Sequence, residues 1–188
     1  MSTDRQKSFI ATLGTDNSPL HFLDVLHDKR ILVAPTFISG GFFTGRPQHQ
    51  DHSHFLGLRP GARTDSNSYL VLYFRHTQFG YILYNRTPGP HYGKCLGSSD
   101  EGLIGAFSPK RSTTFHLLNN NGETVNLDNF NNDAACIYLK ARHSGLIHMQ
   151  TVRGSPYHYV ADNGGVPLVF SLKILERNAP YIDYPDEI

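Results

Sequence analysis

Histidine and aspartate side chains are concentrated in one short stretch of the chain, "HQDHSH". It holds His49, Asp51, His52 and His54, and imidazole and carboxylate groups are common ligands of transition metals. In an extended chain His52 and His54 point to the same side, because side chains alternate along a strand. The stretch is therefore a candidate metal site, with Asp51 or His49 completing the ligand shell. The alternative is a polar connector that leads into the apolar residues after it.

His52 and His54 also resemble the His-x-His pair of cupins. Cupins carry a glutamate a few residues later and a further histidine in a second motif. Here "FLGLRPGARTD" follows, without a glutamate, and "TPGPH" at 87–91 matches the second motif poorly. No Gly-x-Ser-x-Gly elbow and no phosphate loop with its lysine is present. We therefore predict no catalytic residue, no dedicated metal and no cofactor, and we rank a cupin-like metalloenzyme third among the functions considered.

Aromatic and acidic residues occur together in two further parts of the chain. Sugar recognition needs an aromatic face for the apolar side of the ring and planar polar groups for its hydroxyls. The two parts supply both, with Tyr157, His158, Tyr159, Asp162 and Asn163 in one and His91, Tyr92, Asp100 and Glu101 in the other. The alternative is structural, because alternate residues of "YHYVA" face inward in a strand and "DNGG" suits a tight turn.

The elements that must position these residues are predicted to be short strands. Seventeen glycines and eleven prolines divide the 188 residues into apolar runs such as "SYLVLYF", "GYILYN" and "LVFSLKIL". Several runs alternate apolar with polar residues, which is typical of half-buried strands. We therefore predict an all-β protein of one domain. "HFLDVLH" at 21–27 is one expected strand, and the asparagine-rich 119–133 is expected to be a long surface loop.

Runs of the same kind recur in the same order along the chain. A strand ending in Arg-His, a second short strand, an acidic glycine-containing turn and a Phe-x-Leu strand appear twice, and a weaker copy precedes them. We therefore predict three divergent four-strand repeats, at about 20–60, 68–119 and 135–176, with short extensions at both ends of 1–188.

This organisation resembles the β-trefoil family, chiefly through "IYLKARHSGLIHMQ" and "VFSLKIL" and their counterparts at 70–84 and 114–118. The resemblance implies a β-trefoil fold and a function in binding rather than in catalysis. The chain has no tryptophan, so the Gln-x-Trp signature of ricin-B trefoils is absent. The sugar-binding residues of that subfamily are therefore not carried over.

Two classes of partner follow from this resemblance. The first is a glycan or glycoprotein, bound by a lectin-like protein through its aromatic and acidic loops. The second is a protein target, bound as by Kunitz-type or mycocypin-type protease inhibitors or by a fascin-like module. In that case 119–133 or "RTPGPHYG" at 86–93 would enter the partner's cleft. The acidic tail at 176–188 would suit either of two roles, covering the open end of the barrel or pairing with a neighbouring subunit, so a homo-oligomer also stays open.

Composition argues against other partners. The net charge of +1 and a charged fraction of 18% do not suit a nucleic-acid-binding surface. No apolar window reaches the length of a membrane span, and the first residues lack the apolar run of a signal peptide. We expect a cytoplasmic protein or one released without a classical signal peptide.

The two cysteines, Cys95 and Cys136, are too few for a disulfide framework, and whether they pair stays open.

Overall fold

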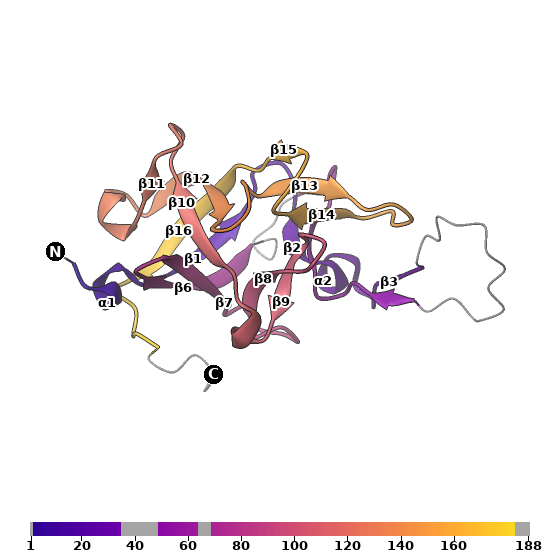
Figure 1. The fold of residues 1–188 in the computed structure, drawn as a ribbon, viewed down its shortest axis with the longest axis horizontal. Helices are drawn as coiled ribbons and strands as arrows, with labels where there is room; N and C mark the ends of the chain where they lie inside the picture. The colour runs from indigo at the N-terminus through magenta and orange to yellow at the C-terminus, as the bar shows by residue number, and fades with distance from the viewer. Residues whose placement is uncertain (1, 35–48, 64–68, 183–188) are drawn as a thin grey trace.

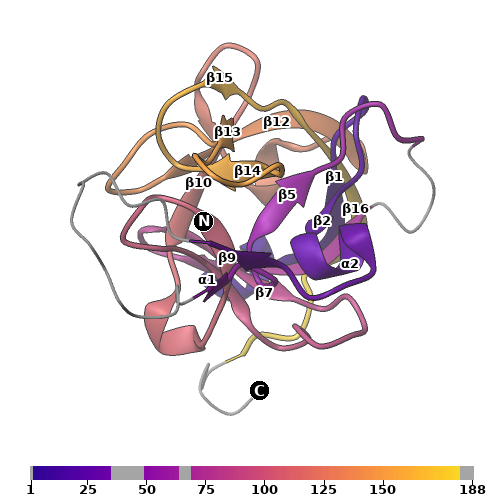
Figure 2. The same ribbon diagram turned by 90° about the vertical axis from the view of Figure 1, so that its right-hand side faces the viewer.

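The computed structural model describes residues 2–34, 49–63 and 69–182, and the all-β class is confirmed, with 46% of residues in strands and 9% in helices. Within these residues, six antiparallel strands pair in a ring and close a barrel (Figures 1 and 2). In the order of their pairing the barrel strands are β1 (Phe9–Gly14), β6 (Leu70–Thr77), β7 (Gly80–Asn85), β10 (Thr114–Leu118), β12 (Ala134–Ala141) and β16 (Phe170–Arg177). The ring closes because β16 pairs again with β1.

The interior of the barrel is filled by alternate side chains of its strands. In β16, Phe170, Leu172 and Ile174 are buried, while the residues between them are more exposed. The rings of Phe9 and Phe74 stack within the same apolar cluster, with their centroids 4.5 Å apart. Burial of each such side chain stabilises the fold by about 1.5–3 kcal/mol. The alternation visible in the sequence therefore describes the inner face of the barrel.

Further strands lie at one end of the barrel (Figure 1). In the described part of the chain a second antiparallel sheet has the order β15 (Val166–Pro167), β13 (His148–Thr151), β14 (His158–Ala161), β5 (Leu56–Leu58) and β2 (Leu20–Phe22). The remaining strands are attached as pairs: β8 (Cys95–Ser98) with β9 (Ile104–Phe107), β3 (Leu32–Val33) with β4 (Gln50–Asp51), and β11 (Thr124–Val125) with β10. The short helices are α1 (Asp4–Lys7), α2 (Leu23–His27) and the 3-10 turns η2 (Pro109–Arg111) and η3 (Leu127–Asn129).

The helix α2 replaces most of the strand that we predicted for 21–27. The backbone N–H of Leu23 donates to the carbonyl of Phe55 at 2.9 Å, and the side chain of Leu23 is fully buried. That side chain occupies the space beside Gly57, where a Cβ would overlap it. The helix ends at Asp28, which adopts a left-handed conformation with a φ of 50°.

Among the described residues, no helix is both long and apolar enough to cross a lipid bilayer.

The predicted β-trefoil of three equivalent four-strand repeats is wrong. The structure is a closed six-stranded barrel with extra strands, and within the described residues the barrel strands are divided unevenly among the predicted repeats. β1 precedes the first repeat, the described part of 20–60 contributes no barrel strand, and 68–119 contributes three. Alternation shows which face of a strand is buried but not which strand lies beside it. Parts of the predicted repeats and of the acidic tail, 35–48, 64–68 and 183–188, lie outside the described residues.

The prediction of a long surface loop at 119–133 is also wrong for its second half. This segment forms β11 and η3 and folds back against the barrel. Leu127 is buried, and its backbone N–H donates to the hydroxyl of Tyr81 at 3.1 Å. A buried N–H needs such a partner, so the interaction ties the segment to β7.

Candidate functional site

A pocket of about 270 Å³ lies between the segment that joins β4 to β5 and the β8–β9 hairpin. Its lining residues are Gln50, Asp51, His52, His54 and Phe55 from β4 and the segment after it, and Ser99, Asp100, Glu101, Phe107 and Arg111 from the hairpin and the turn after it. Backbone contacts hold the two parts together, since Phe55 bridges to Gly105 and the N–H of Ala106 donates to the carbonyl of His54 at 2.9 Å. The pocket thus unites residues that the sequence predicted separately for metal and for sugar.

Asp51 forms a charged edge of the pocket. Its Oδ2 accepts a hydrogen bond from Nε of Arg30 at 2.8 Å, and its Oδ1 accepts one from the backbone N–H of Ser53 at 3.0 Å. Hydrogen bonding from Ser53, assisted by the Arg30 guanidinium, lowers the pKa of Asp51 to about 2. Hydrogen bonds and a nearby cation favour the ionised form. Asp51 is therefore a carboxylate at every pH at which the protein would normally be studied.

His52 forms the inner wall of the pocket and is only 3% exposed. Its Nδ1 lies 2.9 Å from the hydroxyl oxygen of Tyr159, and that oxygen lies 2.7 Å from Oγ of Ser155. Its Nε2 lies 3.3 Å from Oε1 of Gln50. Burial lowers the pKa of His52, so the imidazole is neutral near pH 7. Tyr159, which the sequence predicted as a ligand contact, is fully buried and supports His52 from behind.

Asp162 and Asn163 support the β8–β9 turn and do not line the pocket. Asp162 is 7% exposed, and its Oδ2 accepts a hydrogen bond from Oγ of Ser98 at 2.7 Å. Its backbone N–H donates to the carbonyl of Gly102 at 2.9 Å. Gly102 has a φ of 81°, and a Cβ there would overlap the side chains of Asp162 and Asn163. The turn that holds Asp100 and the turn that holds Asp162 were predicted as equivalent sites in different repeats, but in the structure they contact each other.

The other predicted sugar-binding residues lie outside the pocket. His91 is buried, with its Nε2 2.8 Å from Oδ2 of Asp24. Tyr92 is 53% exposed on the loop between β7 and β8. Tyr157 and His158 are half-buried, Tyr157 just before β14 and His158 at its first position. The nine predicted residues therefore do not form two equivalent surfaces, and Asp100 and Glu101 are the two that line the pocket.

A buried cluster of histidines beside α2 was not predicted from the sequence. His21 is 5% exposed, and its Nδ1 accepts a hydrogen bond from the backbone N–H of Phe22 at 2.8 Å. Burial lowers the pKa of His21 to about 4, although the Asp24 carboxylate acts in the opposite direction. Nδ1 of the neighbouring His91 is buried without a hydrogen-bond partner among the described residues. Nothing in the local sequence signals that these two histidines are neighbours, because His91 is distant in the chain from His21.

The histidine-rich stretch does not have the geometry of a metal centre. In the residues that the structure describes, no group of three or more His, Cys, Asp or Glu side chains could hold an ion. His49 is exposed, Asp51 is paired with a guanidinium, and both ring nitrogens of His52 have hydrogen-bond partners. The ring of His54 packs against Phe55, with the centroids 4.2 Å apart.

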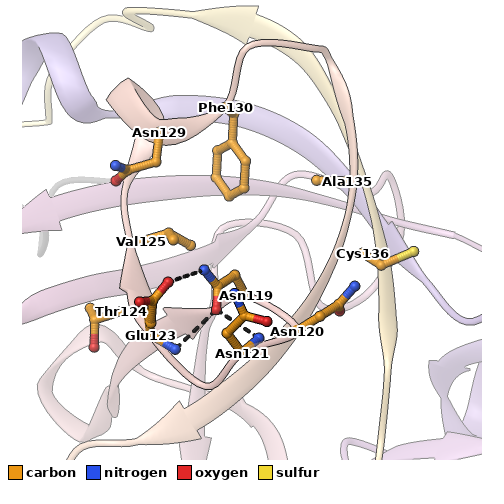
Figure 3. Close-up of a pocket in the computed structure, with 10 residues that line it drawn as sticks. All are labelled: Asn119, Asn120, Asn121, Glu123, Thr124, Val125, Asn129, Phe130, Ala135 and Cys136. Atoms are coloured by element: carbon orange, nitrogen blue, oxygen red, sulfur yellow. Dashed lines mark hydrogen bonds between the residues drawn. The ribbon is translucent and has the colours of Figure 1, made fainter.

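Two larger hollows lie elsewhere on the surface. The first, of about 820 Å³, lies beside the turn between β10 and β11 (Figure 3). Its polar groups bond to one another: Oδ1 of Asn119 accepts from the backbone N–H groups of Asn121 and Glu123, and its Nδ2 donates to Glu123 at 2.8 Å. The second, of about 720 Å³, lies along β1, β6, β12 and β16 and is lined mainly by apolar atoms. Cys136, exposed and not disulfide-bonded to the buried Cys95, borders both.

Comparison with known proteins does not extend this description, since no protein-family model, no curated protein and no solved structure matches the chain. The choice among the hollows therefore depends on their chemistry. The 270 Å³ pocket is the smallest of the three, but it is lined by carboxylates, a guanidinium, imidazoles and aromatic rings. This variety of binding groups makes it the best candidate for a functional site.

Proposed function

We propose that the protein binds carbohydrate, with one sugar ring of a glycan in the 270 Å³ pocket. One observation carries the proposal: acidic, cationic and aromatic side chains from two distant parts of the chain line the same small hollow. Pockets for drug-sized ligands measure about 300–1,000 Å³. A hollow slightly below that range suits a ligand about the size of a single ring.

Carboxylates would recognise the sugar hydroxyls. Asp100 and Glu101 are exposed at the tip of the hairpin, and Asp51 lies in the other part of the lining. An ionised carboxylate accepts hydrogen bonds from neighbouring hydroxyls, and a bond to a charged group contributes about 1.5–3 kcal/mol. Two or three such bonds would orient one ring in the pocket.

An aromatic ring and a guanidinium supply the complementary contacts. Phe107 is half-buried, and the guanidinium carbon of Arg111 lies 5.0 Å from the centroid of its ring. The exposed part of the ring would pack against the C–H face of a sugar, while the guanidinium would donate to sugar oxygens. Because the three-repeat organisation is wrong, we expect one sugar per chain rather than the multivalent binding of a repeated site.

The first test is a glycan array with the purified protein, with and without EDTA, followed by calorimetric titration of any glycan that binds. We expect selective binding at one site per chain that survives EDTA, because the proposed contacts involve no metal. Binding that EDTA abolishes would overturn this assignment of the contacts. It would indicate that a metal takes part in binding, with the histidine-rich stretch as the candidate source of its ligands. A blank array in both conditions would overturn the proposal.

A matched pair of variants tests the location of the site. Glu101→Gln removes a carboxylate from the pocket, and we expect the affinity to fall by about tenfold or more, since a charge-assisted hydrogen bond is lost. Glu176→Gln makes the same change at an exposed position of β16, away from the pocket, and should leave the affinity unchanged. Equal affinities for the two variants would contradict the assignment of the pocket.

A protein-binding role, such as protease inhibition, is the second candidate. The exposed turn at 119–123 favours it, because hydrogen bonds from the Asn119 side chain hold the turn in one shape (Figure 3). A loop that enters a partner's cleft binds better when it is pre-ordered. A panel of proteases tests this role: inhibition at one-to-one stoichiometry that Asn119→Ala weakens would support it, and no inhibition would exclude it for the enzymes tested.

A further inference from the structure

The 720 Å³ hollow lies where the outer wall of the barrel is built mainly from small side chains. The register of β1, β16 and β12 places these side chains in two cross-strand rows, because residues two apart in a strand point to the same side. The first row is Thr12, Lys173 and Ala134, and the second is Gly14, Ser171 and Cys136. The residues between the rows, such as Leu13 and Leu172, are buried inside the barrel. Except for Lys173, the side chains of both rows rise little above the sheet, which leaves room for a ligand.

Larger side chains border this hollow. The ring of Tyr69 lies against Gly14, where a Cβ would overlap it, and Val71 and Leu175 add apolar surface. Most ligand pockets are lined mainly by apolar atoms with a few polar groups, and they measure about 300–1,000 Å³. The hollow belongs to this class by size and lining, and it shares no lining residue with the 270 Å³ pocket.

Two opposite charges line the hollow without pairing with each other. Oδ1 of Asp16 accepts a hydrogen bond from Oγ of Ser171, which holds this exposed carboxylate beside the second row. The exposed Lys173 belongs to the first row, which lies about 7 Å away along β16. Among the described residues, no ion pair joins Lys173 to Asp16 or to another carboxylate. The hollow therefore presents a carboxylate and an ammonium group on an apolar background.

We propose that this hollow binds an α-amino acid with an apolar side chain. The ammonium group of the ligand would donate to Asp16, its carboxylate would accept from Lys173, and its side chain would pack against Tyr69 and Val71. A charge-assisted hydrogen bond measures about 2.8 Å. Two such bonds, together with the short distance between the ammonium and carboxylate groups of an α-amino acid, span the separation of the two rows.

The pair of charges distinguishes this ligand from other apolar molecules. A fatty acid or an apolar amine would satisfy one charge of the hollow and place its apolar body beside the other, which would lose water without gaining a partner. A zwitterion satisfies both charges. Glycine carries the same two charges but has no apolar side chain to bury, so it gains no hydrophobic stabilisation.

Isothermal titration calorimetry with L-phenylalanine is the direct test. Three comparison ligands each lack one feature: 3-phenylpropionate lacks the ammonium group, phenethylamine lacks the carboxylate, and glycine lacks the apolar side chain. We expect saturable binding of L-phenylalanine at one site per chain. Each single-charge ligand should bind about threefold to fivefold more weakly, as loss of one exposed ion pair would cause, and glycine should bind more weakly still. No saturable binding of L-phenylalanine, or an equal affinity for either single-charge ligand, would overturn the inference.

Two substitutions at exposed positions test the roles of the charges. Asp16→Asn keeps an oxygen that accepts from Ser171 but removes the charge, and Lys173→Met keeps an apolar stem but removes the ammonium group. We expect each variant to bind L-phenylalanine about threefold to fivefold more weakly. Asp16→Asn should not weaken 3-phenylpropionate, and Lys173→Met should not weaken phenethylamine. Lys140→Met makes the same change at an exposed position of β12 outside the hollow, and an effect equal to that of Lys173→Met would contradict the site.

Cys136 reports the location of the ligand independently, because its exposed thiol borders the hollow while Cys95 is buried. L-phenylalanine at saturation should slow the reaction of Cys136 with N-ethylmaleimide, and glycine at the same concentration should not. An unchanged rate would overturn the placement of the ligand. Carbohydrate binding at the 270 Å³ pocket is tested separately by the glycan array, so failure of one proposal leaves the other standing.

Discussion

The buried His21 gives the protein a pH-dependent stability that can be calculated and measured. In the folded protein His21 is 5% exposed, and burial lowers its pKa from 6.5 to about 4. Below pH 6.5 the unfolded chain takes up a proton at this position that the folded protein does not. The free energy of unfolding therefore falls as the pH falls, and this loss is complete only below the folded-state pKa.

The size of the effect follows from the two pKa values. Between pH 7 and pH 5, His21 alone should lower the free energy of unfolding by about 2 kcal/mol, and by about 3 kcal/mol once the pH is below 4. Burial also lowers the pKa of His52 and of His54, so these residues add to the loss in the same direction. The contribution of His21 must therefore be isolated by comparison with a variant.

His21→Asn is the informative variant, because the amide oxygen of asparagine can accept the N–H of Phe22 in place of Nδ1. It removes the titrating ring and leaves the other histidines in place. The assay is urea unfolding followed by far-UV circular dichroism at about pH 7 and pH 5, since the chain has no tryptophan for fluorescence. We expect the variant to be less stable at pH 7 but to lose about 2 kcal/mol less than the wild-type protein on acidification. Equal losses in both proteins would refute the argument that His21 is kept neutral by burial.

Two further predictions concern groups that hold the site and the barrel together. Tyr81→Phe leaves the buried N–H of Leu127 without its 3.1 Å acceptor, so urea unfolding should show a loss of about 2 kcal/mol, whereas the exposed Tyr92→Phe should change stability by less than about 0.5 kcal/mol. Ser98→Ala removes the 2.7 Å hydrogen bond to the carboxylate of Asp162, so the free energy of unfolding should fall by about 2 kcal/mol. Any glycan should also bind more weakly, because the hairpin turn loses this support. An unchanged free energy of unfolding together with an unchanged affinity would show that the bond does not position the turn.

The strands were predictable because their signal is local. Runs such as "LVLYFRHT" and "GYILYN" correspond to β6 and β7, and the alternation of "FSLKI" matches the buried residues of β16. The pairing of the strands was not predictable, because the residue pattern of a strand indicates which of its faces is buried but not which strand lies beside it. The β-trefoil resemblance failed at this point: similar runs at similar spacing did not correspond to equivalent structural units.

The helix α2 shows the same limit at the scale of a few residues. The pattern of "HFLDVLH" suits a strand as well as a short buried helix, and local propensity is weak. The space left by Gly57 for Leu23 lies more than thirty residues further along the chain. A packing contact of this kind leaves no trace in the local pattern.

The candidate site, like the fold, was predictable from the sequence only in part. The sequence alone determined which residue types were available: the concentration of Asp51, His52 and His54, the acidic pair Asp100 and Glu101, and short strands to carry them. Only the tertiary structure decided that these groups line one pocket, because the contact between the β5 and β9 segments joins parts of the chain about fifty residues apart. It also decided that Tyr159 and Asp162 act from behind the pocket and do not face a ligand. Side-chain chemistry is a property of each residue, whereas burial and partnership are properties of the folded chain.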